Sequence, residues 1–242
     1  MLTEKSWRPE AVIQFCALLM ASFCLGGVIV TLMDKTGLPA FKAPDGFGAI
    51  LVGTLSFQGV AWGLIGLFLW RHEVDWRVFF GLRDPLMGWV LMLAVAVVLF
   101  LLPVLWCLQA AANEILLLLH FKPATEEAVQ LVEDASSAGV KVYMAVFAIV
   151  LAPVAEEFIF RGMLFPFIKQ LGFPRLAWFG VSGLFALIHL DAATFLPLFV
   201  LALALTWLYD VTGSLLAPIA AHALFNALNL LVLLAQNQPA AP

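Results

Sequence analysis

Two long stretches of the chain contain no charged side chain, and they restrict the fold more than any other feature. Residues 85–113 and 211–242 include no Asp, Glu, Lys or Arg. Each stretch exceeds the roughly 18 to 20 apolar residues that a helix needs to cross a bilayer. The stretches are continuous and lack the alternation of outer-membrane barrel strands, so they predict membrane-spanning helices.

The composition agrees with a membrane protein. Only 12% of the 242 residues are charged, and the mean hydropathy is +1.04. Ordinary soluble domains have about 25% charged residues. The net charge of -4 is small and scattered, so we expect no nucleic-acid partner. Cys16, Cys24 and Cys107 lie in apolar stretches, and we expect them to be small buried hydrophobic residues.

We therefore expect an all-α fold: a polytopic membrane bundle of about seven or eight transmembrane helices with an intramembrane polar cavity. Seven apolar stretches supply the candidate spans: 11–33, 47–70, 86–112, 140–155 continuing to about 170, 175–189, 192–210 and 214–235. We divide the chain into N-terminal spans with an acidic connector (1–139), a helical core (140–235) and a polar tail (236–242). Within the first part, residues 120–139 resemble a polar or amphipathic surface helix.

Lys and Arg residues favour one side of this arrangement. Counted over alternating loops, seven lie on the side of the N-terminus and four on the other. By the positive-inside bias, the N-terminus is expected to be cytoplasmic. The first apolar stretch is longer than the apolar region of a signal peptide, so it is expected to remain as a span.

Charged side chains directly follow the apolar stretch 142–155. Glu156, Glu157 and Arg161 lie there, and ionisable groups at membrane depth are retained mainly where they pair or line a functional cavity. On a helix Glu157 and Arg161 share a face at i, i+4, whereas Glu156 points about 100° away. The spacing predicts that Glu157 and Arg161 neutralise each other and that Glu156 stays free to react. A simple ion pair at a helix end is the alternative for an isolated motif.

Two further motifs place polar side chains on apolar helices. Phe185 and His189 are four residues apart, as are His222 and Asn226, with Asn229 one turn further along. Taken singly, such residues are explained by hydrogen bonds at helix ends or between helices. Taken together with Glu156, they are the groups that hydrolysis of an acyl bond requires.

In that interpretation a glutamate deprotonates water and later protonates the leaving amine. Glu156 is the candidate for this role, and His189 could share the water or its proton. His222 and Asn226 could stabilise the developing oxyanion. Water is the expected nucleophile because no serine or cysteine accompanies these histidines.

A metal site is a separate hypothesis. Glu156, His189 and His222 form a two-His, one-carboxylate set that could hold zinc with an open position. The chain has no His-Glu-x-x-His motif, however, and the three residues come from three different helices. A divalent cofactor such as zinc therefore stays open.

The three motifs, in this order within hydrophobic helices, resemble the CPBP family of intramembrane proteases, which includes type II CAAX prenyl endopeptidases and bacterial Abi proteins. The resemblance covers about residues 140–235. It implies an intramembrane endopeptidase in which Glu156 and His189 activate water, His222 and Asn226 stabilise the oxyanion, and Glu157 and Arg161 support the site. It also implies membrane lipid and a peptide or prenylated-protein substrate as partners, and we expect the bacterial plasma membrane as the location.

Two other functions were compatible with the residues. In a non-catalytic immunity or scaffold protein, the polar side chains would only hold helices together. In a small transporter or proton channel, buried Glu and His would relay protons. The second has no support from paired broken helices or repeats.

Overall fold

The computed structural model describes residues 7–38, 41, 47–83, 85–121 and 138–236, and every regular element within them is a helix. The all-α fold class is confirmed. The helices of the N-terminal part are α1 (Pro9–Lys35), α2 (Phe47–Thr54), the π-helix η2 (Leu55–Gly59), α3 (Val60–Arg71), α4 (Trp76–Phe79) and α5 (Met87–Leu118). Those of the C-terminal part are α7 (Ala138–Val146), η3 (Phe147–Leu151), α8 (Ala152–Glu157), η4 (Phe158–Leu164), α9 (Phe165–Gln170), α10 (Pro174–Leu187), α11 (Ala192–Thr212) and α12 (Leu216–Gln236).

Within the described residues, six helical segments are long and apolar enough to cross a membrane, so the chain is an integral membrane protein. They are Pro9–Lys35, Gly48–Arg71, Met87–Leu118, Gly139–Gln170, Ala192–Thr212 and Leu216–Ala235. The seventh expected span, 175–189, forms α10 with 14 residues. Such a helix is about 21 Å long, which is shorter than the roughly 30 Å of a bilayer's hydrocarbon core.

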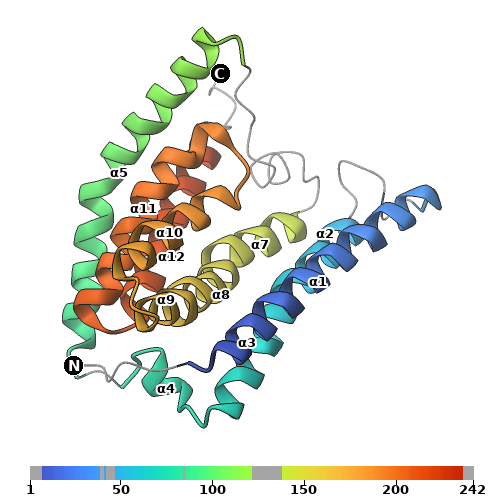
Figure 1. Cartoon of the computed structure of the whole chain (residues 1–242). Coiled ribbons are helices and arrows are strands. Elements are labelled where there is room, and N and C mark those ends of the chain that lie inside the picture. The colour runs from blue at the N-terminus through green and yellow to red at the C-terminus, as the bar shows by residue number, and fades with distance from the viewer. Residues whose placement is uncertain (1–6, 39–40, 42–46, 84, 122–137, 237–242) are drawn as a thin grey trace.

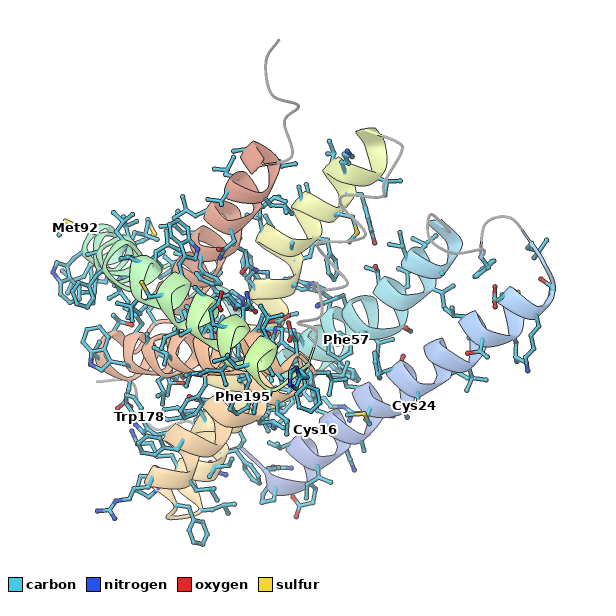
Figure 2. All side chains as sticks on the ribbon, turned by 90° about the horizontal axis from the view of Figure 1, so that it is seen from above. Cys16, Cys24, Phe57, Met92, Trp178 and Phe195 are labelled. Atoms are coloured by element: carbon cyan, nitrogen blue, oxygen red, sulfur yellow. The ribbon has the colours of Figure 1, made fainter. Side chains whose placement is uncertain are left out.

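The helices form a bundle with two different flanks (Figure 1). On one flank α5 packs along α11 and α12, and on the other α1 pairs with the continuous α2–η2–α3 segment. The segment from α7 to α9 runs between them and carries the first charged motif. Seen from above, Met92 on α5 and Cys24 on α1 lie at opposite edges of the bundle (Figure 2).

Hydrogen bonds at Trp7 join the start of α1 to the end of α9. The Trp7 backbone N–H donates to Gln170 Oε1 over 2.9 Å, and Gln170 Nε2 donates to the Trp7 carbonyl over 2.7 Å. The Trp7 ring also contacts His72, which follows α3. The start of α1, the end of α3 and the end of α9 therefore lie together on one side of the bundle, which is the side that the count over alternating loops assigned to the N-terminus.

Two prolines free backbone carbonyls in the α7–α9 segment. Pro153 has no N–H to donate to Ala148, five residues earlier in the π-helix η3, and Pro166 has none for Arg161, the neighbour of Gly162 in η4. The carbonyls of Ala148 and Gly162 are therefore at or beside the interruptions. Both carbonyls instead accept from other helices: Asn226 Nδ2 donates to Ala148 O over 2.8 Å, and Trp7 Nε1 donates to Gly162 O over 3.0 Å. The prolines therefore create two attachment points on the segment that carries the glutamates.

Two expectations from the sequence concern the acidic connector and the cysteines. Most of the acidic connector, residues 122–137, lies outside the described residues. The expectation of buried cysteines is wrong for Cys24 and Cys107, which are exposed, whereas Cys16 is half-buried. In a membrane protein the surface that faces lipid is apolar as well, so an apolar stretch does not distinguish the interior from that surface.

Candidate functional site

Glu157 and Arg161 form a completely buried ion pair. Arg161 Nη1 donates to Glu157 Oε1 over 3.0 Å, and both side chains have 0% exposure. The pairing predicted from their i, i+4 spacing is therefore present. It lies where α8 passes into η4, and π-helical turns are frequent at functional sites.

Three further groups hold the Arg161 guanidinium from the neighbouring helices α10 and α11. Nη2 donates to the Ala202 carbonyl over 2.8 Å, and Nε donates to Thr206 Oγ1 over 3.3 Å. The guanidinium carbon also lies 4.9 Å from the centre of the Phe185 ring. Arg161 thus fixes α8 and η4 against α10 and α11.

His222 on α12 completes the network around Glu157. Its Nδ1 lies 2.9 Å from Glu157 Oε1, and an ionised carboxylate only accepts hydrogen bonds, so Nδ1–H is the donor. His222 Nε2 lies 3.9 Å from Glu156 Oε2. That separation is too long for a direct hydrogen bond and short enough for one water molecule to contact both atoms.

Glu156 has a different environment from its neighbour. Its side chain is 16% exposed, and in the described part of the chain it takes part in no hydrogen bond. The ionisable groups that act on it electrostatically are His222, His189, Glu157 and Arg161. One glutamate is therefore fixed by hydrogen bonds, and the other is only partly enclosed and has free acceptor atoms.

The two asparagines of α12 have different partners. Asn226 is half-buried and uses one N–H of its amide for Ala148 O, which leaves the second N–H for another acceptor. Asn229 accepts from Trp106 Nε1 of α5 over 3.0 Å and donates to the Phe225 carbonyl. Asn229 therefore joins two helices and does not extend the network around Glu156.

His189 lies at the end of α10, and its environment is the most open of the six candidate residues. Its Nδ1 is 2.8 Å from the Phe185 carbonyl, and Phe185 contacts the rings of both His189 and His222. The next residue, Leu190, has φ 54°, a left-handed conformation that is costly for a bulky side chain. The chain therefore turns sharply beside His189.

The predicted zinc ligands do not form a metal site in this conformation. Across the described residues, no three His, Cys, Asp or Glu side chains are grouped closely enough to hold a metal ion. Glu156 Oε2 and His222 Nε2 lie 3.9 Å apart, and His189 does not join them in such a group.

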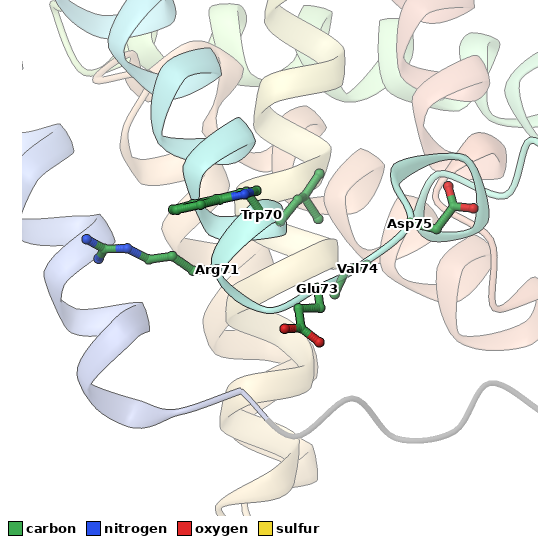
Figure 3. A pocket seen from close by; sticks show the side chains of 6 residues that line it. Trp70, Arg71, Glu73, Val74 and Asp75 are labelled. Atoms are coloured by element: carbon green, nitrogen blue, oxygen red, sulfur yellow. The ribbon is translucent and has the colours of Figure 1, made fainter.

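Two cavities lie away from these residues. One of about 600 Å³ surrounds the turn between α3 and α4, where the side chains from Trp70 to Asp75 spread apart (Figure 3). Another of about 460 Å³ lies between α5 and α11 and has apolar walls, including Phe100 and Trp207. Neither is lined by a candidate site residue.

Sequence reasoning missed several supporting residues. Thr206 Oγ1, which accepts from Arg161 Nε, lies 3.4 Å from Ser182 Oγ, and both residues are fully buried. Single hydroxyl residues on apolar helices are too common to be recognised as functional from the sequence. Pro153 is different. A proline three residues before a glutamate in an apolar helix signals a free carbonyl, and this signal could have indicated the contact of Asn226 with Ala148.

Comparison with protein families supports the resemblance suggested by the motifs. Residues 138–228 match the family described as type II CAAX prenyl endopeptidase Rce1-like, and this range contains all six candidate site residues. Comparison with curated proteins gives no match, and comparison with solved structures gives none either. Over residues 138–228, the chain is therefore similar to the Rce1-like family of type II CAAX prenyl endopeptidases.

Proposed function

We propose that the protein is an intramembrane endopeptidase that hydrolyses a peptide bond by the attack of water activated by Glu156. The observation that carries this proposal is the difference between the two neighbouring glutamates. Glu157 is fixed by Arg161 and His222, whereas Glu156 is partly exposed and faces His222 Nε2. A general base needs free acceptor atoms beside the water that it deprotonates.

The remaining candidates have roles that suit their surroundings. Glu156 takes a proton from water, the oxygen attacks the substrate carbonyl, and the same carboxyl later protonates the leaving amine. Asn226 has one N–H free for the oxyanion, and because His222 Nδ1–H already donates to Glu157, His222 can donate from Nε2 to the oxyanion once the ring is protonated. His189, whose Nδ1 is held by Phe185, can contact the water through Nε2.

The family match supports a proposal for the substrate class. Members of the type II CAAX prenyl endopeptidase family are proteases, so we propose a prenylated peptide or protein that enters from the membrane. The lipid-exposed apolar surfaces of the six candidate spans are consistent with lateral entry. We further propose the bacterial plasma membrane and a cytoplasmic N-terminus, the latter from the excess of Lys and Arg on that side.

The test is cleavage of a fluorogenic farnesylated CAAX peptide by the purified protein in nanodiscs. Glu156→Gln keeps the shape of the side chain and removes the base, so we expect it to abolish cleavage while the protein remains monodisperse. The matched control is Glu114→Gln on the exposed face of α5, which should cleave like the wild type. Full activity of Glu156→Gln would refute the mechanism, and a wild type that binds but never cleaves would favour a scaffold role.

A further inference from the structure

In the N-terminal hairpin, formed by α1 and the continuous α2–η2–α3 segment, two buried polar atoms have no hydrogen-bond partner. They are Gln58 Oε1 in η2 and Trp62 Nε1 in α3, and Gln58 is only 4% exposed. Buried groups without a partner are uncommon because burial removes their bonds to water without replacing them. Within the described residues, the only other such side-chain atoms belong to Glu157 and Asp191. The two hairpin atoms therefore need an explanation.

Their position links them to the helix that carries Glu156. Gln58 and Trp62 are four residues apart on the continuous η2–α3 segment, so they occupy neighbouring turns of one face. Trp62 packs against the main hydrophobic core, which includes Ala155 and Ile159 on either side of the two glutamates. In addition, α3 is in contact with α8 (Figure 1). Ser56 faces α1 and lies two residues before Gln58, so Gln58 and Trp62 point to the side of the segment away from α1, where α3 contacts α8.

On the other side of η2, the interface with α1 is tightly packed. Ser22 Oγ of α1 donates to the Ser56 carbonyl of η2 over 2.6 Å. A Cβ atom at Gly26 would overlap the Ser56 side chain, so the two helices touch at this point. A ligand therefore cannot reach Gln58 and Trp62 through this contact with α1.

The two atoms have complementary chemistry. Gln58 Oε1 is an acceptor, and Trp62 Nε1 is a donor. A residue of an extended chain directs its N–H and its C=O to the same side, as in antiparallel pairing. Inside a membrane, a polypeptide in extended conformation needs protein partners for these groups because lipid supplies none.

We propose that Gln58 and Trp62 bind the backbone of the substrate peptide in the seam between α2–α3 and α8. Gln58 Oε1 accepts from one backbone N–H, and Trp62 Nε1 donates to one backbone carbonyl. This inference rests on the proposed function, since it assigns a binding subsite to the same substrate. Gln58 and Trp62 lie outside the family match, which covers residues 138–228.

The experiment measures binding separately from cleavage. A fluorescent farnesylated CAAX peptide is titrated onto the Glu156→Gln protein in nanodiscs, beside peptides that carry a single N-methyl group at each backbone position in turn. In this background we expect one N-methyl position to weaken binding by about threefold to tenfold, the range of a single hydrogen bond. Adding Gln58→Met should weaken binding of the parent peptide by the same factor and abolish the effect of that N-methyl group. Trp62→Phe should weaken binding while leaving the N-methyl effect unchanged.

Unfolding measurements and a matched control variant distinguish the loss of a binding contact from damage to the fold. Because Gln58 Oε1 and Trp62 Nε1 have no partner in the protein, Gln58→Met and Trp62→Phe should leave unfolding in detergent unchanged or make it harder. Trp70→Phe, two turns further along α3 and 75% exposed, should change neither binding nor stability. Destabilised variants, an N-methyl effect that persists in Gln58→Met, or no peptide binding at all would overturn the inference. If the expected binding pattern appears but the wild type does not cleave, the proposed function fails and the peptide site stands.

Discussion

Replacing Arg161 by methionine tests the account of the buried network most directly. The substitution keeps the length of the side chain and removes its charge. It deletes the hydrogen bonds to Glu157, Ala202 and Thr206, and it leaves the Glu157 carboxylate at 0% exposure without its cation. We expect Arg161→Met to lower the free energy of unfolding by about 3 to 5 kcal/mol, as for other buried pairs that lose one partner.

The origin of that loss follows from where the pair lies. Glu157 and Arg161 are on one helix, so they stay adjacent when the helices separate in detergent, and the pair itself adds little to the difference between the two states. The loss arises because Glu157 is buried and unpaired only in the folded variant. The double variant Glu157→Gln with Arg161→Met should therefore be more stable than Arg161→Met alone, by at least about 1 kcal/mol.

The assay is reversible unfolding in mixed micelles with increasing SDS, followed by circular dichroism. The matched control is Lys169→Met, which removes an exposed ion pair with Asp210 and should cost no more than about 1 kcal/mol. If the double variant is as unstable as Arg161→Met, the lost bonds to α11 explain the effect and the reasoning about the unpaired charge is wrong. A loss for Arg161→Met no larger than that of the control would refute the importance of the network altogether.

Three further predictions concern other parts of the structure. Asn226→Ala should reduce kcat for peptide cleavage by about 100-fold or more, because Asn226 lies one turn from His222 on α12 and keeps an N–H for the oxyanion. Asn229→Ala should lower stability with little change in kcat, because Asn229 binds Trp106 of α5, and equal kcat values would contradict this. Gly81→Ala should lower the SDS midpoint, since Gly81 has φ +78° and an added Cβ would meet Ser214, whereas Gly63→Ala in open space should raise it slightly. Because no three metal-binding side chains are grouped in the described residues, the chelator 1,10-phenanthroline should leave the cleavage rate unchanged, and inhibition reversed by added zinc would show otherwise.

Local spacing predicted the local contacts of the site correctly. The i, i+4 relation of Glu157 and Arg161 became a 3.0 Å ion pair, and Glu156 was left outside it. Membrane-spanning helices followed from uncharged runs, because a helix is the economical way to satisfy the backbone in lipid. Both predictions depend on geometry within one helix, which the sequence determines directly.

Contacts between helices were not predictable in the same way. Sequence spacing did not show that His222 would bind Glu157 through Nδ1, nor that His189 would lie on an exposed turn. These positions depend on how α10 and α12 are rotated and shifted against α8.

The prolines link the hydrogen bonding within one helix to the contacts between helices. Pro153 and Pro166 flank the pair of glutamates, and each leaves a carbonyl of the same segment without its helical donor. Asn226 from α12 donates to the Ala148 carbonyl that Pro153 leaves free, and Trp7 from the N-terminal end donates to Gly162 O near Pro166. The segment that carries Glu156 is therefore held on both sides of its charged residues by donors from other parts of the chain. A positioned carboxylate can act as a base only if its helix does not rotate, so this attachment is what allows Glu156 to remain unbonded without losing its orientation.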